Sequence, residues 1–82
     1  MYYEINVSKR NQSGDYIHYF ATAQRSITAK WKLIEVANDI MDKYPEPYYK
    51  VTVSQQVDIG EMMDAKEFLA DPEKLRISGS DY

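Results

Sequence analysis

Hydrophobic and polar residues alternate along the first part of the chain. From Tyr2 to Lys9 the odd-numbered positions are mostly apolar and the even-numbered ones mostly polar. A period of two is typical of a strand with one buried face. A second alternating segment, from Tyr16 to Ala23, follows a polar stretch over residues 10–15 that contains a glycine suited to a turn. The two segments predict a β-hairpin.

The second segment carries aromatic residues at both odd and even positions. Tyr19 shares one parity with Ile17 and two alanines, whereas Phe20 shares the other with Tyr16 and His18. Small alanines fit beneath a helix, which favours the odd set as the buried one and leaves Phe20 outside, but these residues alone leave the buried parity open. In either case rings should lie on the sheet face that a single helix does not cover. This second face is the first place to look for function.

A helix is predicted from about Ala29 to Lys43. Its apolar residues recur at the helical spacings of three and four, at Leu33, Val36, Ala37, Ile40 and Tyr44. Ser26 or Thr28 is the expected N-cap, because a hydroxyl there accepts a hydrogen bond from a free backbone N–H of the first turn. Pro45 and Pro47 end the helix, since proline lacks the N–H and restricts the residue before it.

The pattern after the helix predicts one more strand and a short helix. Residues 48 to about 57 alternate again, with tyrosine and valines on the buried parity. After Gly60, the acid-x-x-Glu sequence that starts at Asp64 predicts a capped helix over residues 65–70. Asp71 and Pro72 form a similar start for a further helical turn.

The order of these elements predicts a two-layer α+β domain of the ββαβ(α) type. We expect a three-stranded, mainly antiparallel sheet in the order 2-1-3, packed on one main helix, with a short C-terminal helix in addition. Residues 1–76 are expected to form this single domain and residues 77–82 a flexible tail. With 82 residues, folding buries only about 60–65% of the surface of the unfolded chain, so the core is small.

Composition narrows the chemistry open to such a domain. The chain has no cysteine and a single histidine, His18, which excludes a disulfide framework and a typical zinc site. No spacing of residues pairs a nucleophile with a base, and no phosphate-binding or dense oxygen-ligand sequence is present. We therefore expect no cofactor, no bound metal and no enzymatic activity. No apolar stretch approaches the ~20 residues of a membrane span, and no signal peptide is evident at the N-terminus, so a cytoplasmic protein is expected.

Negative charge is concentrated in the last third of the chain. The net charge is −3, and from Asp58 onward seven acidic residues stand against three basic ones, a balance of −4. Carboxylates at steps of three or four residues could imitate phosphates to a nucleic-acid-binding protein, although a step of three drifts by about 60° around a helix, and a solvated acidic surface is the simpler interpretation. The candidate partner-binding acids are Asp58, Glu61, Asp64, Glu67 and Asp71.

The aromatic residues expected on the second sheet face are the other candidate partner-binding residues: Tyr2, Phe20 and Tyr48. Exposed rings suit a protein interface, where they supply contact area at low entropic cost. They also suit the stacking of nucleobases. A third interpretation is purely structural and has the rings packed under apolar residues of the C-terminal segment: Met62, Met63, Phe68 and Leu69.

These observations predict a small acidic, non-enzymatic binding protein that acts through protein–protein contact. Small size, acidity and a lack of catalytic groups are shared by many accessory proteins of phages and mobile elements, including inhibitors of host defence. An inhibitor or phosphate mimic directed at a nucleic-acid-handling protein is the version of this hypothesis to test first. A weak single-stranded nucleic-acid binder is the alternative, although an acidic chain without a basic run makes direct nucleic-acid binding a poor expectation. Homodimerisation through a free strand edge or through the open sheet face, with only a structural role, is a third possibility.

Overall fold

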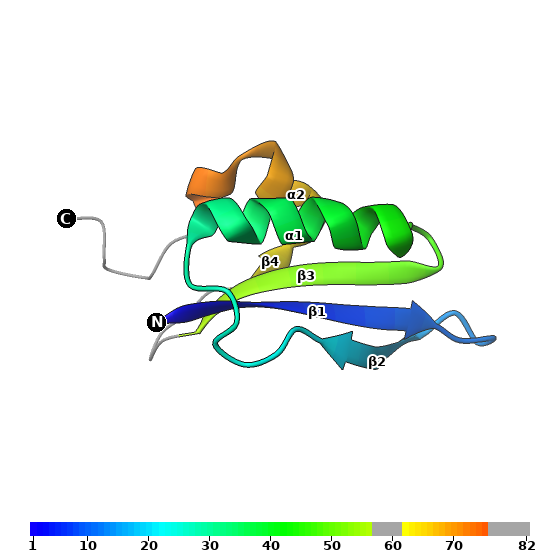
Figure 1. The fold of residues 1–82 in the computed structure, drawn as a ribbon. Coiled ribbons are helices and arrows are strands. Elements are labelled where there is room, and N and C mark those ends of the chain that lie inside the picture. Colours follow the sequence, from blue (N-terminus) through cyan, green and yellow to red (C-terminus); the bar gives the residue numbers. More distant parts are fainter. Residues whose placement is uncertain (57–61, 76–82) are drawn as a thin grey trace.

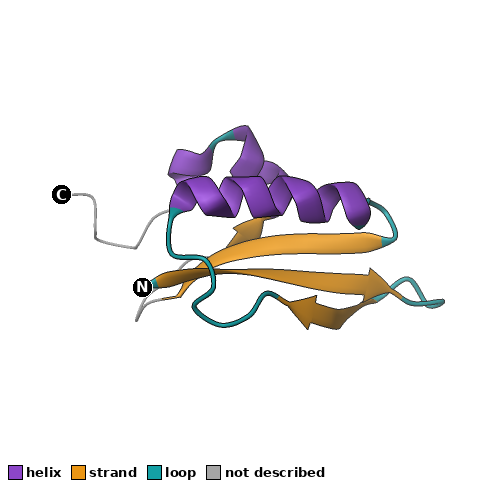
Figure 2. Cartoon of the chain, in the orientation of Figure 1, coloured by secondary structure: helices purple, strands orange, loops and turns teal. Residues whose placement is uncertain are grey.

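Four strands and two helices make up the fold in a computed structural model, which describes residues 1–56 and 62–75. The strands form one sheet in the order β2-β1-β3-β4, with each neighbouring pair antiparallel (Figure 1). Both helices lie on the same side of this sheet (Figure 2). The elements are β1 (Tyr2–Arg10), β2 (Tyr16–Ala21), α1 (Lys30–Lys43), β3 (Tyr49–Gln56), β4 (Met62–Asp64), α2 (Ala65–Ala70) and the 3-10 turn η1 (Pro72–Lys74).

The predicted architecture is confirmed in its main features and wrong in its number of strands. The chain is α+β, its antiparallel sheet packs on a helix, and a short second helix follows. The order 2-1-3 holds for the first three strands, but β4 adds a fourth beside β3, where Asp64 lies opposite Thr52. A strand of three residues contains a single alternation, which is too little for a period of two to be recognised in the sequence.

The two central strands supply the sheet side of the core. Eight consecutive pairs join β1 to β3, from Tyr2 opposite Gln56 to Lys9 opposite Tyr49. The odd residues of both strands face the helices, as their alternation predicts. The buried hydrophobic residues form one cluster: Tyr3, Ile5, Val7, Ile27, Leu33, Ala37, Val51, Val53, Ala65, Phe68 and Leu75.

Helix α1 begins without the predicted side-chain cap. Its N-cap is Ala29, in an extended conformation, and no side chain bonds to the first turn. The hydroxyl of Ser26 instead donates to the carbonyl of Ala23 at 2.6 Å, and Thr28 is exposed. The expectation of a cap at Ser26 or Thr28 is therefore wrong, because the chain uses this segment to reach the sheet edge. There Ile27 is buried and its carbonyl accepts from the N–H of Tyr3 at 2.8 Å.

Helix α2 follows its predicted limits and is capped by the predicted residue. The carboxylate of Asp64 accepts from the backbone N–H of Lys66 at 3.1 Å. Ala65 and Phe68 are buried against α1 and β3, so the C-terminal segment covers the same face as α1. Packing of this segment under the second sheet face, the structural interpretation of the aromatic residues, is therefore wrong for α2.

A β-bulge in β2 decides the parity that the sequence left open. Val7 lies opposite Phe20 but Ser8 lies opposite His18, so Tyr19 is an extra residue in the outer strand. Beyond the bulge, Ile17 lies opposite Lys9, on the same side of the sheet as Val7. Ile17 and Phe20 thus both face the helix side although one is odd and the other even. Neither parity alone is buried, and the expected place of Phe20 on the open face is wrong.

The buried hydroxyl of Tyr3 gives a pH-dependent prediction. Burial raises the pKa of Tyr3 above its ordinary value of 10.0; a hydrogen bond with Gln55 lowers it, and the charge of Glu73 raises it. Since the folded state holds this proton more tightly than the unfolded state, the contribution to stability is complete below pH 10 and is lost as pH rises above it. In urea titrations, the free energy of unfolding should fall less above pH 10 in Tyr3→Phe than in the wild type. Equal slopes would contradict this.

Candidate binding surface

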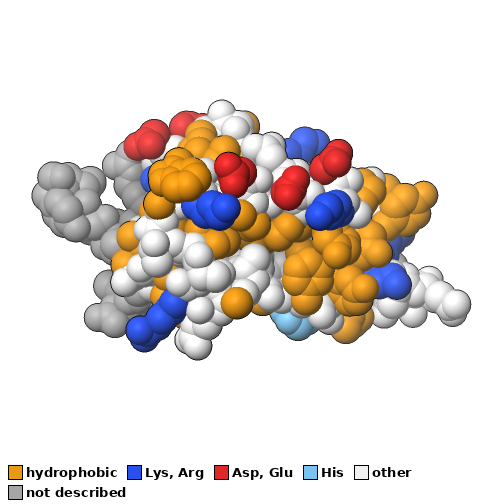
Figure 3. Space-filling model, viewed as in Figure 1, with side chains coloured by type: hydrophobic (Ala, Val, Ile, Leu, Met, Phe, Trp, Pro, Cys, Tyr) orange, Lys and Arg blue, Asp and Glu red, His pale blue; other side chains and the backbone are white. Residues whose placement is uncertain are grey.

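Four rings meet on the helix side of the sheet, beside the C-terminal end of α1. This aromatic cluster consists of Tyr19, Phe20, Tyr44 and Tyr49. The centroid of Tyr44 lies 5.1 Å from Phe20, 5.1 Å from Tyr49 and 6.3 Å from Tyr19, in edge-on arrangements. Tyr19 is also 5.5 Å from Phe20 and 6.0 Å from Tyr49. Figure 3 shows hydrophobic side chains gathered over this end of the molecule, between α1 and β2.

Three separate elements bring the cluster together. Tyr44 is the C-cap of α1, and its backbone N–H bonds to Ile40 at 2.8 Å. Tyr49 begins β3, after the two prolines that follow the helix, and so returns beneath Tyr44. The bulge in β2 places Tyr19 and Phe20 next to them. Because Tyr44 is half-buried and touches all three other rings, it forms the base of the cluster.

The outer part of the cluster is open to solvent and borders positive charge. Tyr19 is 52% exposed, and its neighbour on the same strand, Ile17, is 55% exposed. The ammonium of Lys9 lies 5.8 Å from the centre of the Tyr19 ring, within the range of a cation–π contact. A recess of about 300 Å³ adjoins these residues and is lined by Lys9, Arg10, Asn11, Ile17, His18 and Tyr19. This end of the molecule therefore presents apolar rings next to two cations.

The opposite face of the sheet is mostly polar. Its even-numbered positions on β1 and β3 are Tyr2, Glu4, Asn6, Ser8, Arg10, Lys50, Thr52, Ser54 and Gln56. Tyr2 lies at one end of β1, whereas Tyr16 lies opposite Arg10 at the other end. A separation of eight residues along a strand is about 27 Å. Tyr2 and Tyr16 are thus too far apart to form one stacking platform.

The three aromatic residues chosen from the sequence are not brought together. Tyr2 lies on the polar face, where its hydroxyl accepts from the amide of Gln24 at 3.1 Å. Tyr48 is 66% exposed and precedes β3 at the far end of the sheet, next to Arg10. Phe20 lies on the helix side, half-buried against Tyr44, which corrects its predicted place on the open face. Whether any of them binds a partner stays a prediction.

The acidic candidates divide into two groups. Asp58 and Glu61 lie outside the described residues. Glu67 and Asp71 are exposed, on α2 and just after it. Asp64 is half-buried, and its carboxylate is already engaged in capping α2. Of the candidate acids within the described residues, Glu67 and Asp71 are therefore the two that are open to a partner without loss of the α2 cap.

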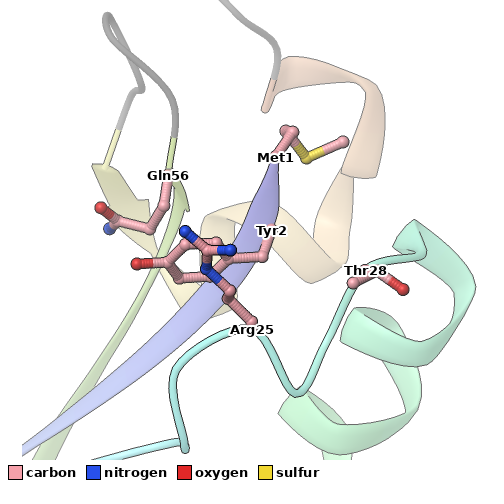
Figure 4. Close-up of a pocket in the computed structure, with 5 residues that line it drawn as sticks. All are labelled: Met1, Tyr2, Arg25, Thr28 and Gln56. Carbon is pink, nitrogen blue, oxygen red and sulfur yellow. The ribbon is translucent and has the colours of Figure 1, made fainter.

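A second recess lies at the N-terminal end of the sheet. Its volume is about 350 Å³, and Met1, Tyr2, Arg25, Thr28 and Gln56 line it (Figure 4). Arg25 holds a left-handed backbone conformation, with φ of 63°. The lining side chains come from the start of β1, the segment before α1 and the end of β3. They include one cation and no carboxylate or imidazole, so they do not pair a nucleophile with a base.

Neither a metal site nor a membrane-spanning helix is found in the described part of the chain. His18 is exposed, and within residues 1–56 and 62–75 no group of three histidine, aspartate or glutamate side chains is arranged to hold a metal ion. None of the described helices is both long and apolar enough to cross a membrane. Comparisons with protein-family models, curated proteins and solved structures find no match.

Proposed function

We propose that this chain is a non-enzymatic binding domain that acts through contact with a protein partner, and that the aromatic cluster is the centre of its contact surface. The observation that carries the proposal is the exposure of Tyr19 and Ile17 beside Lys9, next to three half-buried rings that pack against the core. Aromatic residues held in place by packing lose little entropy on binding and commonly dominate the energy of protein interfaces. A neighbouring cation adds selectivity for a partner with a carboxylate.

If the cluster had a purely structural role, its rings would be buried. The exposure of part of the cluster therefore supports a role in binding. Phe20, Tyr44 and Tyr49 pack against the core, but Tyr19 and Ile17 are each more than half exposed, at 52% and 55%. The bulge adds one residue to β2 and thereby places Tyr19 on the same side of the sheet as Phe20. Bulges frequently re-aim a side chain beside a functional site.

The test compares two exposed aromatic residues. Wild type, Tyr19→Ala and Trp31→Ala are used as baits in cells that naturally express the protein, and captured proteins are identified by mass spectrometry. Trp31 is a matched control, since it is 68% exposed but lies on α1, outside the cluster. We expect one partner to be retained by Trp31→Ala and reduced about 30-fold or more by Tyr19→Ala, the effect of losing a binding hot spot of 2 kcal/mol.

Two results would contradict the proposal. Equal capture by the wild type and Tyr19→Ala would show that the cluster is not the contact surface. Tight binding of a labelled oligonucleotide at low salt, lost on raising the salt, would favour the single-stranded nucleic-acid alternative instead.

Two exposed acidic residues, Glu67 on α2 and Asp71 just after it, extend the same proposal to a nucleic-acid-handling partner. If Glu67 and Asp71 occupy a basic groove of the partner, capture should weaken with salt and in the double variant Glu67→Gln with Asp71→Asn. Asp64→Asn is the matched variant that removes a carboxylate but keeps the cap of α2, because asparagine is also a good N-cap. Capture that is insensitive to salt and to both variants would leave the partner contact with the aromatic cluster alone.

A further inference from the structure

Strand β2 is an edge strand with an open outer side. Within residues 1–56 and 62–75 it pairs with β1 alone, and four of its six residues are exposed. Edge strands are commonly protected by charged residues or proline. β2 contains no lysine, arginine, aspartate, glutamate or proline, and its one basic side chain is that of His18. Its bulge at Tyr19 is a protective feature, but the segment Tyr16–His18 before the bulge pairs regularly with β1.

The direction of each backbone group in β2 follows from the hydrogen bonds of β1. The N–H of Ile5 donates to the Thr22 hydroxyl and its carbonyl accepts from the Thr22 N–H, each at 3.0 Å. The N–H of Arg10 points the other way and donates to Tyr48 at 2.8 Å. The odd residues of β1 therefore bond toward β2. Their opposites, Ile17 and Phe20, bond inward, and the backbone groups of Tyr16 and His18 point outward.

This geometry fits a second copy of the same strand. If two β2 strands meet antiparallel about a two-fold axis at Ile17, Tyr16 of each copy forms a hydrogen-bonded pair with His18 of the other. Ile17 then faces Ile17 of the second copy in a non-hydrogen-bonded pair, in which the Cα atoms are about 4.5 Å apart and the side chains are close. The two exposed isoleucines would cover each other on the helix side of a joined sheet.

Charge complementarity supports the same register. Continuing the pairing by one residue beyond the hydrogen-bonded pair places Asp15 opposite Tyr19 of the second copy. The ammonium group of Lys9 lies 5.8 Å from the centre of the Tyr19 ring. Neither Asp15 nor Lys9 makes an ion pair within the described residues. Two symmetric contacts between Asp15 and Lys9 would thus form across the axis.

We infer that β2 is a self-association edge through which two copies of this chain pair as a continuous sheet. The exposed fractions of Tyr16, Ile17 and Tyr19 are 41%, 55% and 52%. With about 150–250 Å² for each aromatic side chain, these residues offer on the order of 300 Å² per copy. A stable interface needs about 800 Å² per partner, so the dimer is weak and forms at high local concentration. Because the dimer would cover Ile17 and Tyr19, self-association would compete with the proposed partner contact.

Cysteine cross-linking tests the register directly, because the chain has no cysteine of its own. Ile17→Cys is incubated in a glutathione redox buffer beside the control Trp31→Cys, whose position is more exposed, at 68%. We expect Ile17→Cys to form a disulfide dimer at least about 10-fold faster, since its Cα separation across the axis suits a disulfide. A mixture of Tyr16→Cys and His18→Cys should form the heterodimer in preference to either homodimer.

Adding His18→Pro to Ile17→Cys removes one outward N–H and leaves the bonds to β1 in place, since proline is tolerated where the N–H faces away from the sheet. Circular dichroism confirms that each variant is folded. We expect the cross-linking rate of this double variant to fall to that of Trp31→Cys. The inference is overturned if Ile17→Cys reacts no faster than the control, if His18→Pro leaves the rate unchanged, or if the mixture shows no preference. Only purified protein is used, so the outcome is independent of partner capture.

Discussion

Replacement of Phe68 by alanine is expected to lower the free energy of unfolding by about 3–5 kcal/mol, the usual cost of removing a buried phenylalanine. Phe68 is fully buried and is the largest such side chain in the core. It comes from α2 and packs with residues of α1 and of the central strands. For 82 residues the whole stability is about 4–12 kcal/mol, so this one change removes a large share of it. Urea unfolding followed by circular dichroism measures the loss.

The control for Phe68→Ala is Trp31→Ala. Trp31 is a larger aromatic residue, but it is 68% exposed, so its replacement should change the free energy of unfolding by no more than about 0.5 kcal/mol. A cost below about 1 kcal/mol for Phe68→Ala would contradict the placement of α2 in the core. It would then favour an N-terminal unit that is stable without the C-terminal segment.

The sequence predicted those elements in which the spacing of apolar residues repeats several times. β1 and β3 alternate over most of their length, and the buried positions are those of the predicted parity. The predicted limits of α1 and α2 agree with the structure within one residue, because proline ends the first helix and Asp64 caps the second. These signals are local, and each is contained in a few neighbouring residues.

The features that the sequence did not predict depend on contacts between distant segments. Nothing in the composition of β2 marks Tyr19 as an extra residue, since its register is set by β1. The segment before α1 contains two hydroxyl residues suited to capping, yet Ile27 is buried and pairs with Tyr3. Burial of this isoleucine outweighs a local capping bond, which is worth only about 1 kcal/mol.

The candidate surface was only partly predictable for the same reason. Aromatic residues at both parities in the second segment indicated that rings would be exposed, and Tyr19 is exposed. The expected face was wrong for Phe20, because the bulge turns it to the helix side together with Tyr19. Tyr2 and Tyr16 lie on the face that the helices leave uncovered, as expected. Tyr44 and Tyr49 were assigned to the buried faces of their elements and are half-buried there. Their spacing of five residues across two prolines was the one available signal that they would meet at the end of α1.

Replacement of Tyr44 by alanine is expected to lower the free energy of unfolding by about 2–3 kcal/mol. The cost exceeds that of an exposed tyrosine because Tyr44 contacts three other rings, with centroid distances of 5.1, 5.1 and 6.3 Å. Each aromatic pair contributes about 0.5–1.5 kcal/mol beyond the area it buries. Tyr19→Ala should cost less than about 1 kcal/mol, since half of its ring is already in water. Urea titrations of both variants give the two values.

The comparison of Tyr44 with Tyr19 separates the supporting part of the aromatic cluster from its contacting part. If the proposed function is correct, Tyr44→Ala weakens partner capture through loss of support for Tyr19, whereas Tyr19→Ala weakens it at a smaller cost in stability, below about 1 kcal/mol. A double-mutant cycle should then give a coupling energy of about 0.5–1.5 kcal/mol for unfolding, as for neighbouring aromatic pairs. Equal stability losses in the two single variants, with partner capture unchanged in both, would assign the whole cluster to the core and remove the basis for contact at this end of the molecule.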